Sequence, residues 1–118
     1  MLSPFAECSL KRLASELLST TRPAMIIGTC TIVLYLPAAG SLKEKRSVVK
    51  SILARVHNEF NVAIAEVDYQ DVCQQAVLGL ACVSTSQNHA HSQIEAVVRF
   101  IERRRPDLPL VSYEIEML

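Results

Sequence analysis

The sequence has no lysine or arginine between Val56 and Val98, a long central stretch of the chain. Acidic residues do occur there, at Glu59, Glu66, Asp68, Asp71 and Glu95. Apart from Lys11, Arg12 and Arg22, every basic residue lies within residues 43–55 or 99–105. The formal net charge is zero, which argues against a general binder of polyanions. The charge is nevertheless segregated along the chain, and this predicts a folded surface with one basic side.

Long apolar runs and paired cysteines are missing as well. No apolar stretch approaches the ~18 residues that a membrane-spanning helix requires, so we expect no membrane segment. The four cysteines, Cys8, Cys30, Cys73 and Cys82, form no C-x-x-C pair and no zinc-ligand spacing. Cys30 and Cys82 fall in apolar, strand-like runs, where a reduced thiol packs as a small hydrophobic side chain. This pattern favours a cytoplasmic protein.

The motifs of common catalytic sites are also absent. The sequence contains no glycine-rich phosphate loop, nucleophile elbow or Cys–His motif. His89 and His91 lie in a polar stretch without further zinc ligands, so we expect solvated side chains. We therefore predict a protein that is not an enzyme and that has no cofactor, no metal site and no catalytic residues.

Residues 1–24 differ in character from the rest and form a separate N-terminal extension. The stretch contains one short helical stripe, made by Leu10, Leu13, Leu17 and Leu18, which Pro23 would end. Met25 then opens a strong strand and is itself a plausible native start. Two interpretations stay open: a misassigned start or dispensable extension, and a short targeting or partner-binding helix.

Residues 25–118 show the alternation of a single α+β domain. Strands are expected at residues 26–36, 62–69, 76–84 and 108–118. A first helix follows the capping box formed by Ser41 and Glu44, and a second carries the stripe Ile94, Val97, Val98 and Ile101. The order β-α-β-β-α-β with right-handed crossovers predicts a ferredoxin-like sandwich, in which two helices pack on one face of a four-stranded antiparallel sheet.

From Met25 onward the chain resembles the YlxP-like family, small bacterial proteins of unknown function. The stretches that carry the resemblance are "MIIG", "SLKEKRSVVKSI", "FNVAIAEVDYQDV" and "VLGLACVS". This chain departs from the family pattern at Cys73, where a Trp is usual, and at Gln75, where a basic residue is usual. The resemblance implies a ferredoxin-like fold and, from the genes that neighbour its members, a role near RNA or the ribosome. It supplies no catalytic residues.

Basic residues near the start of the first helix are the main candidate site. Positive charge in a first helical turn opposes the helix macrodipole, at about 0.3–1 kcal/mol per charge at low salt. Lys43, Arg46 and Lys50 share one face at three- and four-residue spacings, with Lys45 nearby. Arg99 and the run Arg103–Arg105 lie on or just after the second helix, where the alternative of a solvated face that pairs with the helix dipole stays open. We predict contact with RNA or the ribosome through Lys43, Lys45, Arg46, Lys50, Arg99 and Arg103.

The sheet face opposite the helices is a second candidate surface. We expect Ala63, Ala65 and Val67 to face the helices, so that Glu66 and Asp68 reach the open face. Glu114 and Glu116 on the last strand are expected to join them there. An acidic sheet face repels phosphate and lacks the exposed aromatics of an RNA-recognition motif. The alternative is therefore a protein that forms a homodimer, or binds a protein partner, through this face.

The acidic turn after the second strand is the last candidate. Glu66, Asp68 and Asp71 together could hold a hard cation, as a metal-assisted enzyme would require. The plainer interpretation is that edge carboxylates discourage strand pairing and that Asp71 nucleates a turn. The sequence favours the plainer interpretation.

Overall fold

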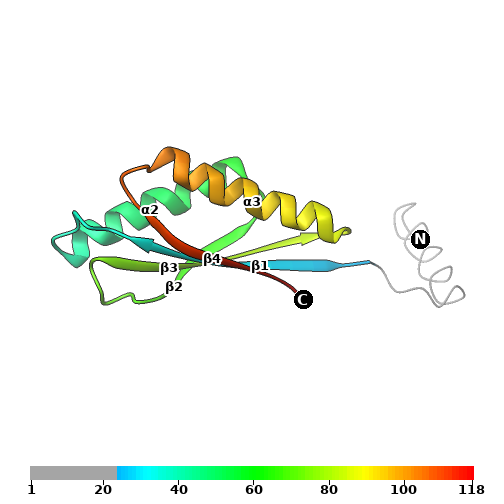
Figure 1. Ribbon diagram of the computed structural model, residues 1–118, viewed down its shortest axis with the longest axis horizontal. Coiled ribbons are helices and arrows are strands. Elements are labelled where there is room, and N and C mark those ends of the chain that lie inside the picture. The colour runs from blue at the N-terminus through cyan, green and yellow to red at the C-terminus, as the bar shows by residue number, and fades with distance from the viewer. Residues whose placement is uncertain (1–23) are drawn as a thin grey trace, which may run out of the picture.

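Four antiparallel strands form one sheet in the order β2-β3-β1-β4 in the computed structural model, which describes residues 24–118. The strands are β1 (Ile26–Tyr35), β2 (Ala63–Asp68), β3 (Gln75–Ser84) and β4 (Leu110–Met117). Both helices, α2 (Leu42–Glu59) and α3 (Gln87–Arg104), cover the same face of the sheet (Figure 1). The predicted βαββαβ ferredoxin-like sandwich is therefore confirmed. The expectations for the N-terminal extension fall on residues outside the described part, apart from Ala24 itself.

Helix α2 begins at the predicted capping box. Its N-cap is Ser41, whose hydroxyl oxygen accepts a hydrogen bond from the Glu44 amide at 3.2 Å. The Glu44 carboxylate in turn accepts from the Gly40 amide at 2.8 Å, which brings negative charge to the positive end of the helix dipole. The helix ends at Glu59, and Phe60 is its C-cap in an extended conformation. This cap turns the chain towards β2.

The hydrophobic core lies between the helices and the sheet. Alternate residues of β1 and β3 point inwards, and they meet the buried stripe that the sequence predicts for α3. Helix α3 approaches β1 closely at Gly28, where an added Cβ would lie 2.9 Å from Ile94 Cδ1. The inward-facing core residues of these three elements include Cys30, Ile32, Leu34, Ala76, Leu78, Leu80, Cys82, Ala90, Ile94, Val97, Val98 and Ile101.

The prediction of which β2 side chains face the helices is wrong. Ile64 is buried among the core residues, whereas Ala63 and Ala65 are exposed on the open face of the sheet. Glu66 pairs in register with the buried Leu78 and shares its helix-facing side. The larger Ile64 side chain removes more apolar surface from water than the alanines would, and this favours the observed orientation.

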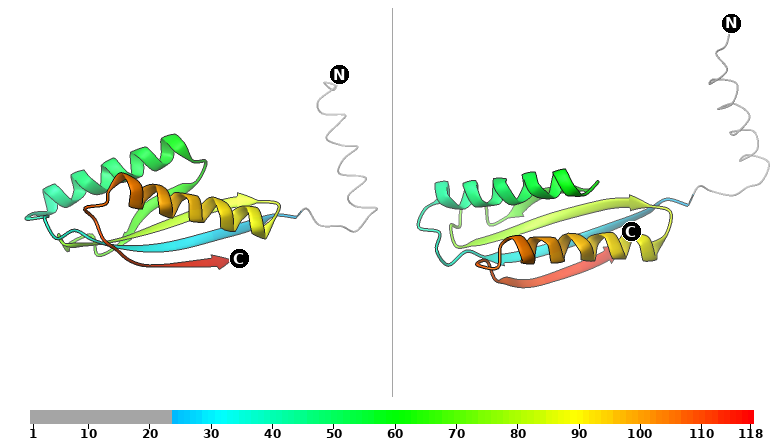
Figure 2. Two further views of the ribbon diagram at one scale, coloured as in Figure 1. Left: turned by 45° about the horizontal axis from the view of Figure 1, so that its top comes forward. Right: turned by 90° about the horizontal axis from the view of Figure 1, so that it is seen from above.

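The two helices lie side by side and run in opposite directions across the sheet (Figure 2). They are also offset along their axes, so that the C-terminal half of α2 lies beside the C-terminal half of α3. The surface between these two halves is lined by residues 51–60 of α2 and its cap and by residues 96–105 of α3. These are the segments that carry the candidate site.

Candidate nucleic-acid interface

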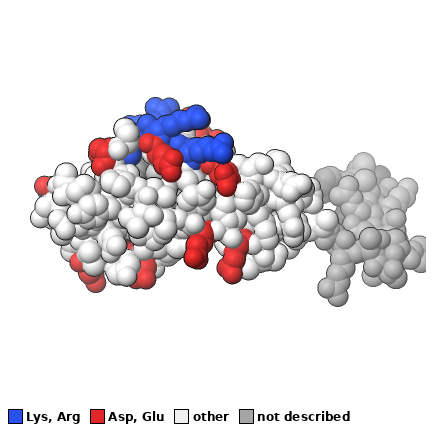
Figure 3. Space-filling model, viewed as in Figure 1, with Lys and Arg blue, Asp and Glu red and all other residues white. Residues whose placement is uncertain are grey.

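All lysines and arginines of the described chain lie on the helices or at the C-cap of α3. The four strands contain none. Figure 3 shows the blue side chains gathered over the helices, with acidic side chains both beside them and on the sheet side. The basic residues are therefore confined to the helical face, whereas acidic residues occur on both faces, including Glu59 on α2 and Glu95 on α3. The helical side is the one on which an anion would bind.

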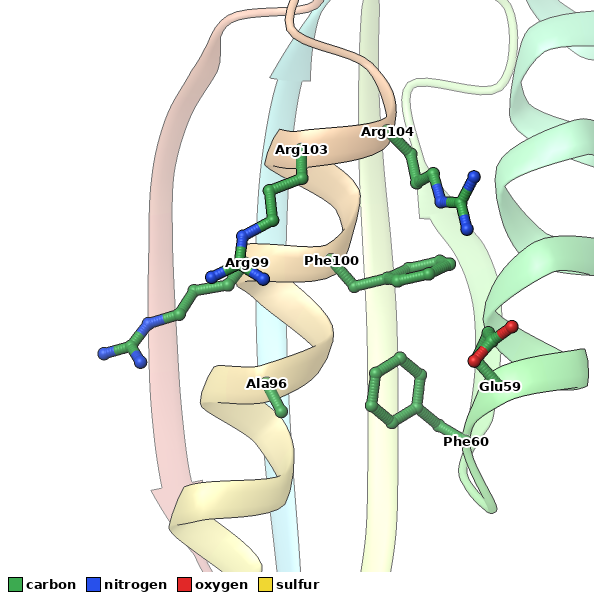
Figure 4. Close-up of a pocket in the computed structure, with 7 residues that line it drawn as sticks. All are labelled: Glu59, Phe60, Ala96, Arg99, Phe100, Arg103 and Arg104. Carbon is green, nitrogen blue, oxygen red and sulfur yellow. The ribbon is translucent and has the colours of Figure 1, made fainter.

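A groove runs between α2 and α3 on this basic side. It has a volume of about 540 Å³; its walls combine arginines of α3 with one aromatic side chain from α3 and one from the C-cap of α2 (Figure 4). It continues towards Arg55 and Asn58 of α2. The residues that line its main part are Glu59, Phe60, Ala96, Arg99, Phe100, Arg103 and Arg104.

Two phenylalanines form the floor of the groove. The rings of Phe60 and Phe100 meet edge to face, with their centroids 5.4 Å apart and their planes at 79°. The Arg104 guanidinium carbon lies 5.3 Å from the Phe100 centroid, which is a cation–π distance. Both rings are only partly buried and pack against the core, so the floor is held by the fold while part of each ring stays accessible.

The arginines around the groove differ in how their charge is compensated. Arg99 lies 3.4 Å from the Glu95 carboxylate, one helical turn earlier. Within residues 24–118, no carboxylate comes within 4.0 Å of Arg55, Arg103 or Arg104. Three guanidinium groups from two helices therefore remain available to an external anion. Arginine suits phosphate, because its planar fork donates two parallel hydrogen bonds.

Arg105 does not belong to the arginines that are available to an external anion, because its guanidinium is already paired with Asp107. Its Nε and Nη2 donate to the two carboxylate oxygens of Asp107 at 3.1 and 3.0 Å. This hydrogen bonding from Arg105 holds the pKa of the Asp107 carboxyl below its usual value. The pair fixes the turn that leads into β4.

Lys45, one of the predicted RNA-binding residues, is not available to a ligand. Its side chain is completely buried, and its Nζ lies 2.8 Å from Glu66 Oε2 on β2. The same ammonium group donates to the carbonyl of Tyr69. The assignment of Lys45 as a surface binding residue is therefore wrong, because the adjacent strand supplies its counter-ion.

Lys43, Arg46 and Lys50 are exposed on α2, as expected. None of them lines the groove. At about 100° per residue, they point about 120–180° around the helix from Arg55. They form a second basic surface on the outer side of α2, separate from the arginine groove. Of the predicted residues, the structure brings only Arg99 and Arg103 together in one concave site.

The acidic residues of the predicted turn site do not converge. Glu66 faces the helices and pairs with Lys45. A bulge separates Glu66 from Asp68, which pairs with Val77 on the other side of the sheet and accepts a hydrogen bond from the Tyr69 amide. Asp71 lies beyond the strand end and is exposed. No group of three potential metal ligands is found among the residues that the structure describes.

The sequence-based prediction of the site did not include Arg55, Asn58, Glu59, Phe60, Ala96, Phe100 or Arg104. A signal for α3 was present, since Ala96, Phe100 and Arg104 recur at four-residue spacing on the side of the buried stripe that faces α2. The contribution of α2 depends on how far the two helices overlap. That overlap cannot be read from either helix alone.

Neither described helix combines the length and apolar character needed to cross a membrane. The sequence profile of a family described as "Protein of unknown function (DUF503)" matches residues 27–115. A Bacillus subtilis (strain 168) relative, "Uncharacterized protein YlxP", is 47% identical over 73 residues, which cover 62% of this chain and 77% of the relative. A solved structure, "De novo designed protein Foldit4", shares 13% identity with a TM-score of 0.48 over 80% of this chain and 96% of that one. The chain therefore belongs to the DUF503 family, to which its resemblance to YlxP-like proteins had pointed.

Proposed function

We propose that this protein is a non-catalytic, cytoplasmic accessory protein that binds RNA, on or near the ribosome, through the groove between α2 and α3. The observation that carries this proposal is that Arg55, Arg103 and Arg104 line adjoining parts of one aromatic-floored groove and have no carboxylate partner within 4.0 Å among the described residues. Arginine and exposed aromatic faces are the groups that bind phosphates and unstacked bases.

The rest of the surface supports the choice of the helical side. The open sheet face offers no positive charge, and Glu114 and Glu116 lie on it beside Thr29 and Thr31. Phosphate would be repelled there. The free, separated cysteines of the described chain suit a reducing compartment, in agreement with a cytoplasmic location.

Co-sedimentation with ribosomal subunits, and binding to total ribosomal RNA, across a range of salt concentrations tests this proposal. If the groove arginines contact about four phosphates, the logarithm of the association constant falls with a slope of about −3 against the logarithm of the salt concentration for single-stranded contacts. If the protein neither binds RNA nor sediments with ribosomal subunits at low salt, the proposal is rejected.

A second candidate function is self-association through the open sheet face. This face exposes apolar side chains, including Val83 at 66% and Val67 at 54%, beside the small residues Ala63 and Ala65. The strands lie about 4.8 Å apart and run from about 20 Å (β2) to about 33 Å (β1 and β3), so the face presents roughly 540 Å² per copy. Two such faces bury about 1,100 Å², just above the roughly 1,000 Å² that a specific interface needs, so a second copy is the occupant that we favour.

Light scattering after size exclusion tests self-association. The candidate predicts a dimer for the native protein and a monomer for Val83→Lys, a substitution on the exposed face that leaves the core intact. A native protein that remains monomeric at high concentration would exclude this candidate, and it would leave the arginine groove unaffected.

A further inference from the structure

We infer that the groove binds one unpaired guanine nucleotide, with the base stacked on Phe60. This inference rests on the proposed RNA-binding function and assigns the part of the RNA that the groove recognises. Three observations carry it: the orientation of the Phe60 ring, the position of Glu59, and the size of the groove.

Phe60 is the ring with an open face. Both faces of the Phe100 ring are covered, because the Arg104 guanidinium lies over one face at 5.3 Å and the edge-to-face partner Phe60 lies at the other (Figure 4). Viewed from the helical side of the sheet, Phe100 is seen edge-on, whereas the Phe60 ring turns its face towards the viewer. Phe60 is half-buried, so its position is fixed while one face stays accessible. A base that stacks on it fills the groove between the helices.

Glu59 is the single carboxylate among the groove residues, and it lies beside Phe60. Within the described chain it makes no ion pair at 4.0 Å or less, although Arg55 and Arg104 line the same part of the groove. A carboxylate only accepts hydrogen bonds, and it accepts best from two adjacent donors. Guanine is the base whose Watson–Crick edge offers two adjacent donors, N1–H and the N2 amino group, so Glu59 selects guanine over adenine, cytosine and uracil.

The arginines complete the site at the phosphate. Arg99 and Arg103 line the groove from α3, and their guanidinium groups lie on the side of α3 away from Glu59 (Figure 4). This separation places positive charge away from the base edge, as the geometry of a nucleotide requires. The groove volume of about 540 Å³ is that of a small-ligand site and accommodates one nucleotide. A base within a duplex is stacked on both sides and cannot reach Phe60, so the ligand is unpaired.

Fluorescence anisotropy with labelled oligouridine of about 10 nucleotides tests the inference. The central nucleoside is guanosine, adenosine or inosine, whose base lacks the N2 amino group of guanine. A fully paired duplex of the guanine strand is the fourth probe. We expect the guanine probe to bind about 5- to 100-fold more tightly than the adenine probe, with inosine between them and the duplex weaker than the guanine strand. Equal affinity for guanine and adenine, or tighter binding of the duplex, would overturn the inference.

Two variants assign the preference to the groove. Glu59→Gln replaces an exposed side chain and should remove the preference for guanine while the affinity for the adenine probe stays the same or rises. Phe60→Leu should weaken binding of the guanine strand about 5-fold or more. The melting temperature of this protein variant is the control for folding. A preference for guanine that survives Glu59→Gln would contradict the assignment.

Two further probes separate this inference from the proposed function. Free GMP that competes as well as the guanine strand would show that the ligand is a free nucleotide, and so would overturn binding of an RNA base. RNA binding that depends on the groove arginines but ignores the base would reject the guanine site and keep the proposed function. Binding of oligoglutamate without binding of any RNA would reject both.

Discussion

The ammonium group of Lys45 lies 2.8 Å from the carboxylate of Glu66, in a buried ion pair that joins α2 to β2. The same ammonium donates to the carbonyl of Tyr69, a non-glycine residue with a positive φ of 56°. The left-handed region is costly for a side chain as bulky as tyrosine. Lys45 therefore fixes the end of β2 and the turn after it. Its positive charge, which the sequence predicted to bind a ligand, stabilises the fold instead.

Removal of one partner of this pair should destabilise the protein strongly. Lys45→Met leaves the Glu66 carboxylate without its counter-ion and should lower the free energy of unfolding by about 3–5 kcal/mol. The double variant Lys45→Met with Glu66→Leu should be clearly more stable than Lys45→Met alone. Urea denaturation followed by circular dichroism measures both. Full stability of Lys45→Met would show that the pair is not formed in solution.

The Cys30 thiol should give the protein a loss of stability at alkaline pH. Burial in the core raises the pKa of Cys30 from 9.0 to about 11. Between these values the unfolded chain releases the thiol proton and the folded chain keeps it, so the free energy of unfolding falls as the pH rises. This contribution is complete below about pH 9 and falls by up to about 3 kcal/mol by pH 11. Unfolding curves at several pH values, compared with those of Cys30→Val, isolate the thiol, and identical pH profiles for the two proteins would contradict the prediction.

Close packing between β1 and α3 should make Gly28 sensitive to the smallest substitution. In Gly28→Ala the new methyl group would lie 2.9 Å from Ile94 Cδ1 and 3.4 Å from Ala90 Cβ. We expect a loss of about 1–3 kcal/mol, because the buried Ile94 has little room to move. Gly40→Ala is the matched control, since the nearest atom to its Cβ is Glu44 Oε2 at 3.7 Å. It should be neutral or stabilising by up to about 1 kcal/mol, and equal losses in the two variants would refute the packing argument.

The fold could be predicted because periodicity and capping act locally. The Ser41–Glu44 box and the α3 stripe determine where helices form and which side they bury. The orientation of β2 could not be predicted with the same rule, since Ala63 and Ala65 alternate with Ile64 and Glu66, and both sets contain apolar residues. A buried glutamate becomes favourable only once Lys45 lies opposite it, and that contact joins residues distant in sequence.

The candidate site was partly predictable for the same reason. The sequence shows that Arg99 and Arg103 lie on one helix, but not that Phe60, at the end of the other helix, packs against Phe100. The sequence predicted binding at the first turn of α2, where positive charge opposes the helix dipole. In the structure Lys45 has an internal partner there, and Lys43 points away from the groove. Concavity arises from the packing of two helices, and local charge does not reveal it.

The proposed function requires that RNA bind at the groove and not merely to positive charge anywhere on the helices. Two triple variants with the same change in net charge separate these possibilities. The groove variant carries Arg55→Ala, Arg103→Ala and Arg104→Ala. The control variant carries Lys43→Ala, Arg46→Ala and Lys50→Ala on the outer side of α2.

The most direct measurement is the affinity of both variants for single-stranded ribosomal RNA fragments as a function of salt. We expect the groove variant to lose at least about 10-fold in affinity at low salt, with the salt slope reduced by about 2, because three phosphate contacts are removed. The control variant should stay within about 3-fold of the native protein. Equal losses in the two variants, or a loss confined to the control variant, would contradict the claim.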